Sequence, residues 1–406
     1  MYFQTLDDKT ECVGIYTDNQ LFFDLSEFPP DLKYTWKYAP YLKDLDVEYI
    51  SLYLEGKTIS EVIPEYLKDD WGDVSEKLTA FKRSLSIAQV DTQENCFFDL
   101  VPPRFLIEFC EVKNKITQYI YNNVERPCRY EFYKHVSMML EEISTRPVKI
   151  DKQRVASYSD IQKLKNQASA LLTCDPSARY NQFGTKTGRL TTKKGSFPIL
   201  TLNKEFKSAI QPQNDYYIEL DFNGAEVRTL LGLLGKEQPP GDVHNFHLEN
   251  VFKDLSGREQ AKTDFFAWLY GSRTAVSKEN AQKLSSFYER STLLQQYWDG
   301  DTVTTPFRKQ ITGVSEHHAL NYLIQSTAAE LTLKQALKLE YLLRKQSHGS
   351  HIAFLIHDAI VIDMKKEDAH LLKPLIALMS STNFGKFMVN VKKGKTLGSL
   401  KDIGSG

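Results

Sequence analysis

The chain has 406 residues, which is enough for two or three domains with separate hydrophobic cores. No apolar run approaches the roughly 20 residues that span a bilayer, and the first residues lack the basic start and apolar core of a signal peptide. We therefore expect a cytoplasmic protein (in the host cytoplasm if it is viral) that makes no membrane contact. The five cysteines are scattered without a CxxC pair, which argues against a disulfide framework or a cysteine zinc site.

The net charge of −1 hides an uneven distribution of charge along the chain. Residues 1–90 carry 17 acidic and 9 basic side chains, a balance of −8, which leaves +7 for residues 91–406. Because the acidic part lies at one end, the rest of the chain can hold a basic groove for nucleic acid.

The expected elements change character along the chain. Residues 1–92 predict a small acidic domain, with alternating apolar runs typical of a hairpin at 12–25 and helical patterns around 40–68. Residues 96–180 predict long helices, with a break at 127–129. From 183 onward strands and helices alternate irregularly, which indicates an α+β region.

Two acidic residues follow β-prone runs. The apolar run 216–220 ends on Asp221 and is followed at once by a helical pattern, which places Asp221 at a strand end. Residues 352–364 read as a hairpin with His357 and Asp358 at its tight turn. One sheet can bring both carboxylates together, and such a pair needs a counter-charge, usually a divalent metal ion. The alternative is that each Asp is an ordinary turn residue.

A third feature weighs against that alternative. Arg258, Lys262, Phe266 and Tyr270 recur every four residues, so on a helix they form one slanted stripe. Its guanidinium and ammonium groups suit a triphosphate, and its first aromatic ring suits a stacked base. The competing interpretation is an amphipathic helix with a basic edge.

At this point the chain resembles the family A (DNA polymerase I-like) DNA polymerases. Six motifs fall in that family's order: Thr187–Leu190, Leu220–Arg228, Asp242–His244, Arg258–Gly271, Asn321–Glu330 and His357–Asp358. The resemblance covers roughly residues 180–400.

The resemblance implies a right-hand polymerase architecture of the α+β class, in which a palm with an antiparallel sheet carries helical fingers and a helical thumb. We assign residues 1–92 to the small N-terminal domain, 93–182 to the helical thumb region, 183–240 and 311–406 to the two parts of the palm, and 241–310 to the fingers.

The resemblance also implies roles for the motif residues. Asp221 and Asp358, helped by the backbone carbonyl of Phe222, would bind two Mg²⁺ ions, for which Mn²⁺ can substitute. Lys262 would bind the triphosphate and donate a proton to the leaving pyrophosphate. The other expected nucleotide-binding residues are Arg258, Phe266, Tyr270, His244 and Glu226.

Further residues would contact primer–template DNA, the expected partner besides deoxynucleotides. Glu226 would exclude a 2′-hydroxyl and so favour deoxynucleotides. Minor-groove acceptors are shared by all base pairs, so polar donors there can test pair shape without reading sequence. The expected DNA-binding residues are Arg189, Asn321, Gln325, His357, Lys193 and Lys194.

The chain departs from the family pattern in the last motif, where Ala359 stands in place of a Glu and cannot bind metal. Its compactness suggests phage or viral DNA replication without an intrinsic 3′–5′ exonuclease, with a separate exonuclease or processivity partner as a further hypothesis. Two alternatives remain: a single-subunit RNA polymerase, against which Glu226 argues, and a non-catalytic DNA-binding polymerase relative, to which only Ala359 points.

Overall fold

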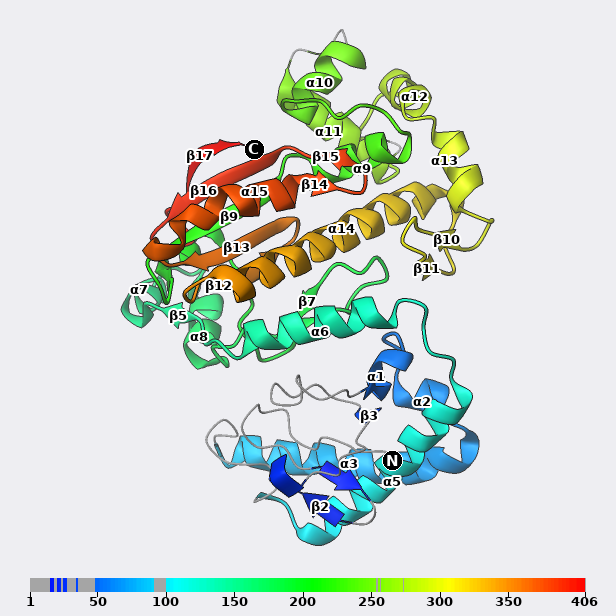
Figure 1. Cartoon of the computed structure of the whole chain (residues 1–406), viewed down its shortest axis with the longest axis vertical. Helices are drawn as coiled ribbons and strands as arrows, with labels where there is room; N and C mark the ends of the chain where they lie inside the picture. The colour runs from blue at the N-terminus through cyan, green and yellow to red at the C-terminus, as the bar shows by residue number, and fades with distance from the viewer. Residues whose placement is uncertain are drawn as a thin grey trace. The chain divides into compact units, whose positions relative to one another are not determined.

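The computed structural model of the chain describes residues 15–17, 20–22, 25–27, 34–35, 48–90, 100–252, 255, 257–272 and 274–405. It divides into two compact units, Met1–Thr145 and Arg146–Gly406, whose elements are labelled in Figure 1. The helical region expected at 93–182 is therefore shared between the two units.

The first unit opens with short strands, as the alternating apolar runs predict. Strands β1 (Ile15–Thr17) and β2 (Gln20–Phe22) pair antiparallel as a hairpin, and a short helical turn, η1 (Leu25–Glu27), follows. Strand β3 (Tyr34–Thr35) pairs in parallel with β4 (Glu48–Tyr49).

The other described elements of the first unit are helices. They are α1 (Ile50–Tyr53), α2 (Ile59–Val62), α3 (Glu65–Ile87), α5 (Pro103–Asn123) and α6 (Tyr130–Ser144). Helix α2 begins with a capping box, in which the carboxylate of Glu61 accepts a hydrogen bond from the backbone N–H of Thr58. Helices α3 and α5 pack through aromatic contacts, including Phe81 against Phe105 with ring centroids 4.8 Å apart.

The second unit is built on a five-stranded sheet in the order β12-β13-β9-β16-β17, and every neighbouring pair is antiparallel. The strands are β9 (Tyr216–Phe222), β12 (His351–Ile356), β13 (Ala359–Met364), β16 (Val389–Gly394) and β17 (Lys401–Ser405). The sheet and the surrounding helices confirm the α+β class.

Two helices, α14 (Glu316–Gln346) and α15 (Leu372–Ser380), cover one face of this sheet, as Figure 1 shows. Ile218 and Leu220 of β9 are buried. Because side chains alternate along a strand, Glu219 and Asp221 belong to the opposite face of the sheet. The apolar periodicity therefore determines which face of the sheet carries the acidic residues.

A second set of helices follows β9 in the chain: α9 (Ala225–Leu233), α10 (Val243–Asn250), α11 (Arg258–Leu269), α12 (Lys278–Phe287) and α13 (Arg290–Tyr297). They share a core that contains Phe265 and Tyr288, both fully buried, together with Trp268. Thus α11 is fixed by apolar contacts on one side; of its stripe, Phe266 packs against this core, while Arg258, Lys262 and Tyr270 are not part of it.

The remaining elements of the second unit are short. They are α7 (Lys152–Ser157), α8 (Lys165–Thr173), η3 (Lys204–Ala209), η4 (Lys366–Leu371), and the strand pairs β5 (Lys149–Ile150) with β8 (Ile210–Gln211), β6 (Tyr180–Asn181) with β7 (Thr191–Thr192), β10 (Val303–Thr304) with β11 (Gln310–Ile311), and β14 (Ser381–Thr382) with β15 (Gly385–Lys386). Among the described residues, no helix is long and apolar enough to cross a membrane.

Candidate active site

The two acidic residues predicted at strand ends come together on neighbouring strands. Asp221 lies on β9, and its partner in the β13 register is Ala359. Asp358 immediately precedes Ala359 in the two-residue turn between β12 and β13, where His357 adopts a left-handed backbone with φ of 55°. The hairpin thus brings the carboxyl group of Asp358 beside that of Asp221.

Both carboxyl groups resist ionisation in the structure. Burial raises the pKa of Asp221 to about 6, with a smaller contribution from the neighbouring charge of Glu219. The pKa of Asp358 is also raised, mainly by burial and then by the charges of Glu226 and Asp221. Burial thus favours the neutral form of both carboxyl groups, and the charges of Lys392 and Arg189 oppose it only in part.

A divalent cation would suit this buried pair of carboxyl groups, because a bound cation would favour the ionised form of both. Among the described residues, no three or more His, Cys, Asp or Glu side chains are grouped so that they could hold a metal ion. The side chains here whose chemistry suits such an ion are the two carboxylates, Asp221 and Asp358.

Three neighbours of Asp221 were not identified from the sequence. Asn390 on β16 faces Asp221 in the strand register and donates a hydrogen bond to it. Lys392, on the same strand, pairs with Glu219, with 2.6 Å between Nζ and Oε1. Glu219 could have been identified from the sequence, because side chains two residues apart on a strand lie on the same face. Asn390 and Lys392 could not, because nothing in the sequence indicates how β16 pairs with β9.

On the other side of the carboxylate pair, four predicted residues from separate parts of the chain form one network. The Nη2 atom of Arg189 lies 2.5 Å from Oε1 of Glu226, whose side chain is buried. The hydroxyl group of Tyr270 is hydrogen-bonded to Arg189 and to Gln325 of α14, and its pKa is raised by burial and by the charge of Glu226. The structure thus joins the expected sugar gate to the expected DNA contacts.

The stripe on α11 forms as predicted, but its members have different surroundings. Lys262 is exposed, and Phe266 and Tyr270 stack on each other with ring centroids 5.7 Å apart. Arg258, at the first turn of the helix, is paired with Asp242.

His244 occupies a buried position on α10. Its side chain is only 4% exposed, and burial lowers its pKa to about 4. Burial therefore favours the neutral form of the imidazole. Its Nδ1 atom is buried and has no hydrogen-bond partner within the described structure, so a polar interaction with a ligand remains open to it.

The remaining predicted DNA contacts differ in their surroundings. Arg189, His357 and Asp358 share the wall of one small cavity. Burial and the charges of Arg189 and Lys207 lower the pKa of His357. Further members of the predicted set are Asn321, whose Oδ1 atom is buried without a partner in the described part of the chain, and the exposed Lys193 and Lys194.

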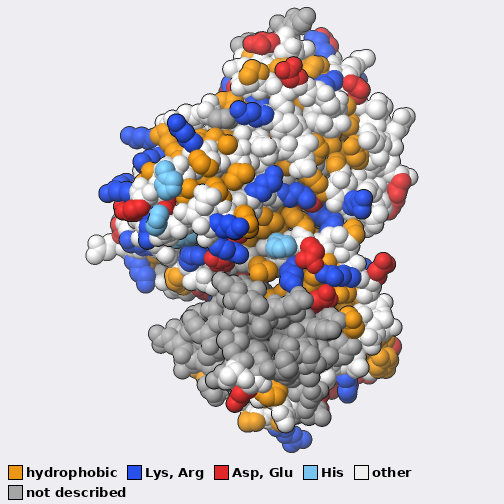
Figure 2. Space-filling view, viewed as in Figure 1, with side chains coloured by type: hydrophobic (Ala, Val, Ile, Leu, Met, Phe, Trp, Pro, Cys, Tyr) orange, Lys and Arg blue, Asp and Glu red, His pale blue; other side chains and the backbone are white. Residues whose placement is uncertain are grey.

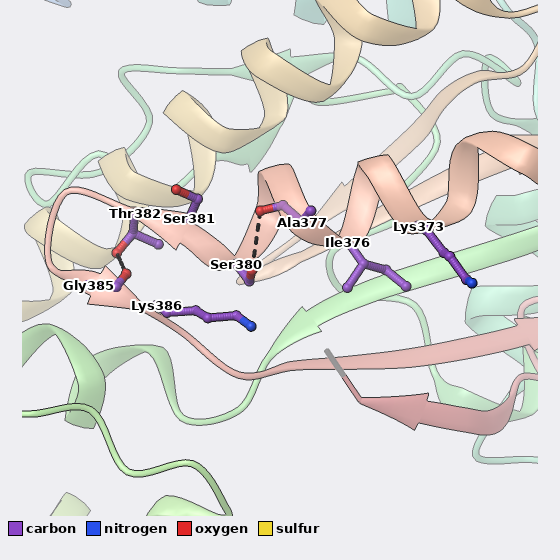
Figure 3. Close-up of a pocket in the computed structure, with 8 residues that line it drawn as sticks. All are labelled: Lys373, Ile376, Ala377, Ser380, Ser381, Thr382, Gly385 and Lys386. Carbon is purple, nitrogen blue, oxygen red and sulfur yellow. Dashed lines mark hydrogen bonds between the residues drawn. The ribbon is translucent and has the colours of Figure 1, made fainter.

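A larger hollow of about 650 Å³ lies elsewhere, between α15 and the β14–β15 hairpin, and contains none of the predicted site residues. Figure 3 shows two of its hydroxyl groups bonded to nearby carbonyls, Ser380 to Ala377 and Thr382 to Gly385. Lys and Arg side chains are dispersed among hydrophobic ones on the face of the second unit seen in Figure 2. The hollow between α15 and the β14–β15 hairpin has no acidic or histidine residue in its lining, so it is a poor candidate for catalysis.

Comparisons with known proteins find similarity to DNA polymerases. No protein-family model matches the chain. DNA polymerase I of Chloroflexus aurantiacus is 22% identical over 330 residues, which cover 68% of this chain and 35% of that protein. The thermostable DNA polymerase I of Thermus filiformis is 25% identical over 243 residues, which cover 49% of this chain and 29% of that protein.

A solved structure extends the comparison to the fold. The polymerase domain of Pol1 from M. smegmatis, in complex with DNA primer-template and dNTP, matches with a TM-score of 0.58 and 14% identity, over 73% of this chain and 76% of that one. The chain is thus similar in sequence to family A DNA polymerases and in fold to a polymerase domain. The resemblance seen in the motifs is thereby confirmed, and the second unit's antiparallel sheet and helices agree with a polymerase fold.

The matched region is only part of each curated relative, which limits what can be concluded from the similarity. The chain spans about a third of the length of the curated family A relatives it matches. The activity, substrates and partners of a family A polymerase are therefore proposals for this chain, and its own geometry must support them.

Proposed function

We propose that the chain is a DNA-directed DNA polymerase that adds deoxynucleotides to a primer 3′-hydroxyl on a template. The observation that carries this proposal is the pairing of β9 with β13, which sets Asp221 beside Asp358. The raised pKa values of both carboxyl groups support it, since such a pair is costly without a cation.

In this proposal Asp221, Asp358 and the carbonyl of Phe222 would hold two Mg²⁺ ions, or Mn²⁺ in their place, whose charge would activate the 3′-hydroxyl and stabilise the leaving group. The 3′-oxygen attacks the α-phosphorus, and the bond from that phosphorus to the bridging oxygen of pyrophosphate breaks. Lys262 is exposed on α11 and is the proton donor to the departing pyrophosphate. Arg258 binds the triphosphate through its guanidinium.

Selection of the nucleotide would depend on the aromatic stripe and on Glu226. Phe266 stacks on the incoming base, and Tyr270 lies next to it in the chain's own aromatic stack. Glu226 is buried beside Arg189, so its carboxylate is held in one place and can exclude a 2′-hydroxyl. A rigid group discriminates better than a mobile one, because it cannot move aside for the larger sugar.

Contacts with the primer–template would come from the same network. Arg189, Gln325, Asn321 and His357 supply polar groups for minor-groove acceptors, which are common to all base pairs. Lys193 and Lys194 are exposed and would contact backbone phosphates, so binding should weaken as salt rises.

Primer extension on a defined template tests the proposal. The wild-type protein should extend a primer with dNTPs in the presence of Mg²⁺, and Asp358→Ala should abolish extension. A well-folded wild type that binds primer–template without extending it would favour the non-catalytic alternative. Preference for rNTPs would favour a single-subunit RNA polymerase and overturn the role of Glu226.

We further propose that the chain acts in phage or viral replication, without 3′–5′ exonuclease activity of its own. This part rests on the sequence, in which the recognised motifs all serve synthesis. Incubation with a 3′-mismatched primer and no dNTPs should leave the primer intact. Removal of the terminal nucleotide by purified protein would contradict it, and a separate exonuclease or processivity partner would then lose its rationale.

A further inference from the structure

The guanidinium of Arg258 is fully engaged with carboxylates. Its Nε and Nη2 atoms donate to the two oxygens of Asp242, at 3.0 and 2.8 Å, as a bidentate pair. Its Nη1 atom donates to Oε1 of Glu259. The Nε–Nη2 edge of the guanidinium is therefore held by the half-buried carboxylate of Asp242. The remaining nitrogen, Nη1, contacts Glu259, whose side chain is 80% exposed.

Asp242 is itself fixed from several directions. It caps α10, where its Oδ1 atom accepts hydrogen bonds from the backbone N–H groups of His244 and Asn245 at 3.0 and 3.1 Å. Its Oδ2 atom accepts a further bond from the side-chain amide of Asn223 at 3.2 Å. Burial alone would raise the pKa of Asp242, but these bonds and the pairing with Arg258 hold it well below its usual range.

The side-chain amide of Asn223 also connects Asp242 to the carboxylate site. Asn223 follows Asp221 by two residues, and its Oδ1 atom accepts the backbone N–H of Val243 at 3.1 Å. Its backbone carbonyl accepts a bond from Nε of the buried Arg228 at 2.7 Å. The first residue of α11 is thus connected through Asp242 and Asn223 to the end of the strand that carries Asp221.

We propose that Asp242 is the positioning residue for Arg258: it holds the Nε–Nη2 edge of the guanidinium so that Nη1 faces the triphosphate, and Glu259 occupies that place until the nucleotide binds. This rests on the proposed function, in which Arg258 binds the triphosphate. The two carboxylates then have opposite roles. Asp242 orients the guanidinium before binding, whereas Glu259 competes with the phosphate oxygens and must move away.

The two variants Asp242→Asn and Glu259→Gln separate these roles. Asparagine caps a helix as well as aspartate does, so Asp242→Asn keeps α10 capped but cannot accept the bidentate pair. We expect it to raise KM for dNTPs by roughly tenfold with kcat changed less than about threefold, since it weakens nucleotide binding rather than chemistry. Glu259→Gln removes the competitor, so KM should fall by about two- to fivefold.

Two further measurements distinguish positioning from a structural effect. The first is the equilibrium affinity of a complementary dNTP for the protein bound to a dideoxy-terminated primer–template, which cannot react. It should weaken in Asp242→Asn by the same factor as KM. The second is a double-mutant cycle: in an Arg258→Ala background, Asp242→Asn should add no further loss of affinity, because it acts through Arg258.

The outcomes separate this inference from the proposed function. If the wild type does not extend primers, the proposed function fails. If it does, and Asp242→Asn leaves KM and dNTP affinity within about twofold, this inference alone is overturned. A loss of thermal stability and kcat with unchanged KM, or an equal effect of Asp242→Asn with and without Arg258, would also overturn it.

Discussion

Glu226 and Arg189 form an ion pair that joins the expected sugar gate to an expected primer contact, with 2.5 Å between Oε1 and Nη2. Glu226 is 6% exposed, so loss of Arg189 would leave a buried carboxylate without this ion-pair partner. Tyr270 is hydrogen-bonded to Arg189 as well, so the three side chains form one continuous network. Under the proposed function, this network would couple sugar selection to the geometry of the primer end.

Glu226→Ala should relax sugar selection. Removal of the side chain opens space for a 2′-hydroxyl, so we expect incorporation of rNTPs relative to dNTPs to rise by roughly 10²-fold. Single-nucleotide insertion kinetics with paired rNTP and dNTP substrates measure this ratio. Glu226→Gln is the matched control: it keeps the bulk but loses the ion pair, so it should retain most of the selection. Equal ratios in Glu226→Ala and the wild type would exclude Glu226 as the gate.

Removing one carboxylate should have opposite effects on the metal-free and metal-bound protein. Asp358→Asn removes a carboxylate whose ionisation is opposed mainly by burial and then by the charges of Glu226 and Asp221, so we expect the metal-free protein at pH 7.5 to gain about 1–3 kcal/mol of stability. The wild type should melt at a higher temperature when Mg²⁺ is added, and Asp358→Asn should lose that rise. The exposed Asp160→Asn is the control and should behave like the wild type. A Mg²⁺-dependent rise that survives in Asp358→Asn would argue against this metal site.

How far the sequence could predict this site depends on how local each contact is. Asp221 and Asp358 were identified because each ends a β-prone run, and a hairpin turn fixes its own geometry within a few residues. The hydrogen bond from Asn390 was not foreseen, because it depends on a strand that joins the sheet about 170 residues later in the chain. Helical spacing likewise placed Arg258 on the stripe, but it could not indicate that Asp242 would be its partner.

Arg228 should be essential for the stability of the second unit. Its fully buried guanidinium donates to the carbonyls of Asn223, Pro239 and Gly241 at 2.7–2.8 Å. A lysine cannot reach three carbonyls in this fork arrangement, so Arg228→Lys should cost about 2–4 kcal/mol of unfolding free energy.

Chemical denaturation of both proteins checks this prediction. The matched control is Arg290→Lys, because Arg290 makes an exposed ion pair with Glu316 at 3.4 Å. Such pairs contribute about 0–1 kcal/mol, so this variant should stay close to the wild type. Similar losses in both variants would show that the three buried hydrogen bonds of Arg228 carry no special weight.

His247 should make the second unit sensitive to acid. Its imidazole is fully buried, with Nε2 2.5 Å from the hydroxyl of Tyr288, and burial, aided by the charge of His244, lowers its pKa to about 3. The unfolded chain takes up this proton near pH 6.5, whereas the folded chain does not. The contribution of the buried, neutral His247 to the free energy of unfolding is therefore fully present above pH 6.5. It decreases as the pH drops toward 3, and at pH 5 it is lower by about 2 kcal/mol.

Urea unfolding at pH 7.5 and pH 5.0, followed by tryptophan fluorescence, measures this loss. Trp268, one of the four tryptophans, reports close to His247, because its ring stacks on that of Tyr288 with centroids 5.6 Å apart. In His247→Gln the loss between the two pH values should shrink by about 2 kcal/mol, since one titrating group is gone. Tyr288→Phe is the control: it should lower stability at both pH values but keep most of the pH dependence, because the imidazole remains buried. If His247→Gln and the wild type lose equal stability on acidification, another group must carry the acid sensitivity.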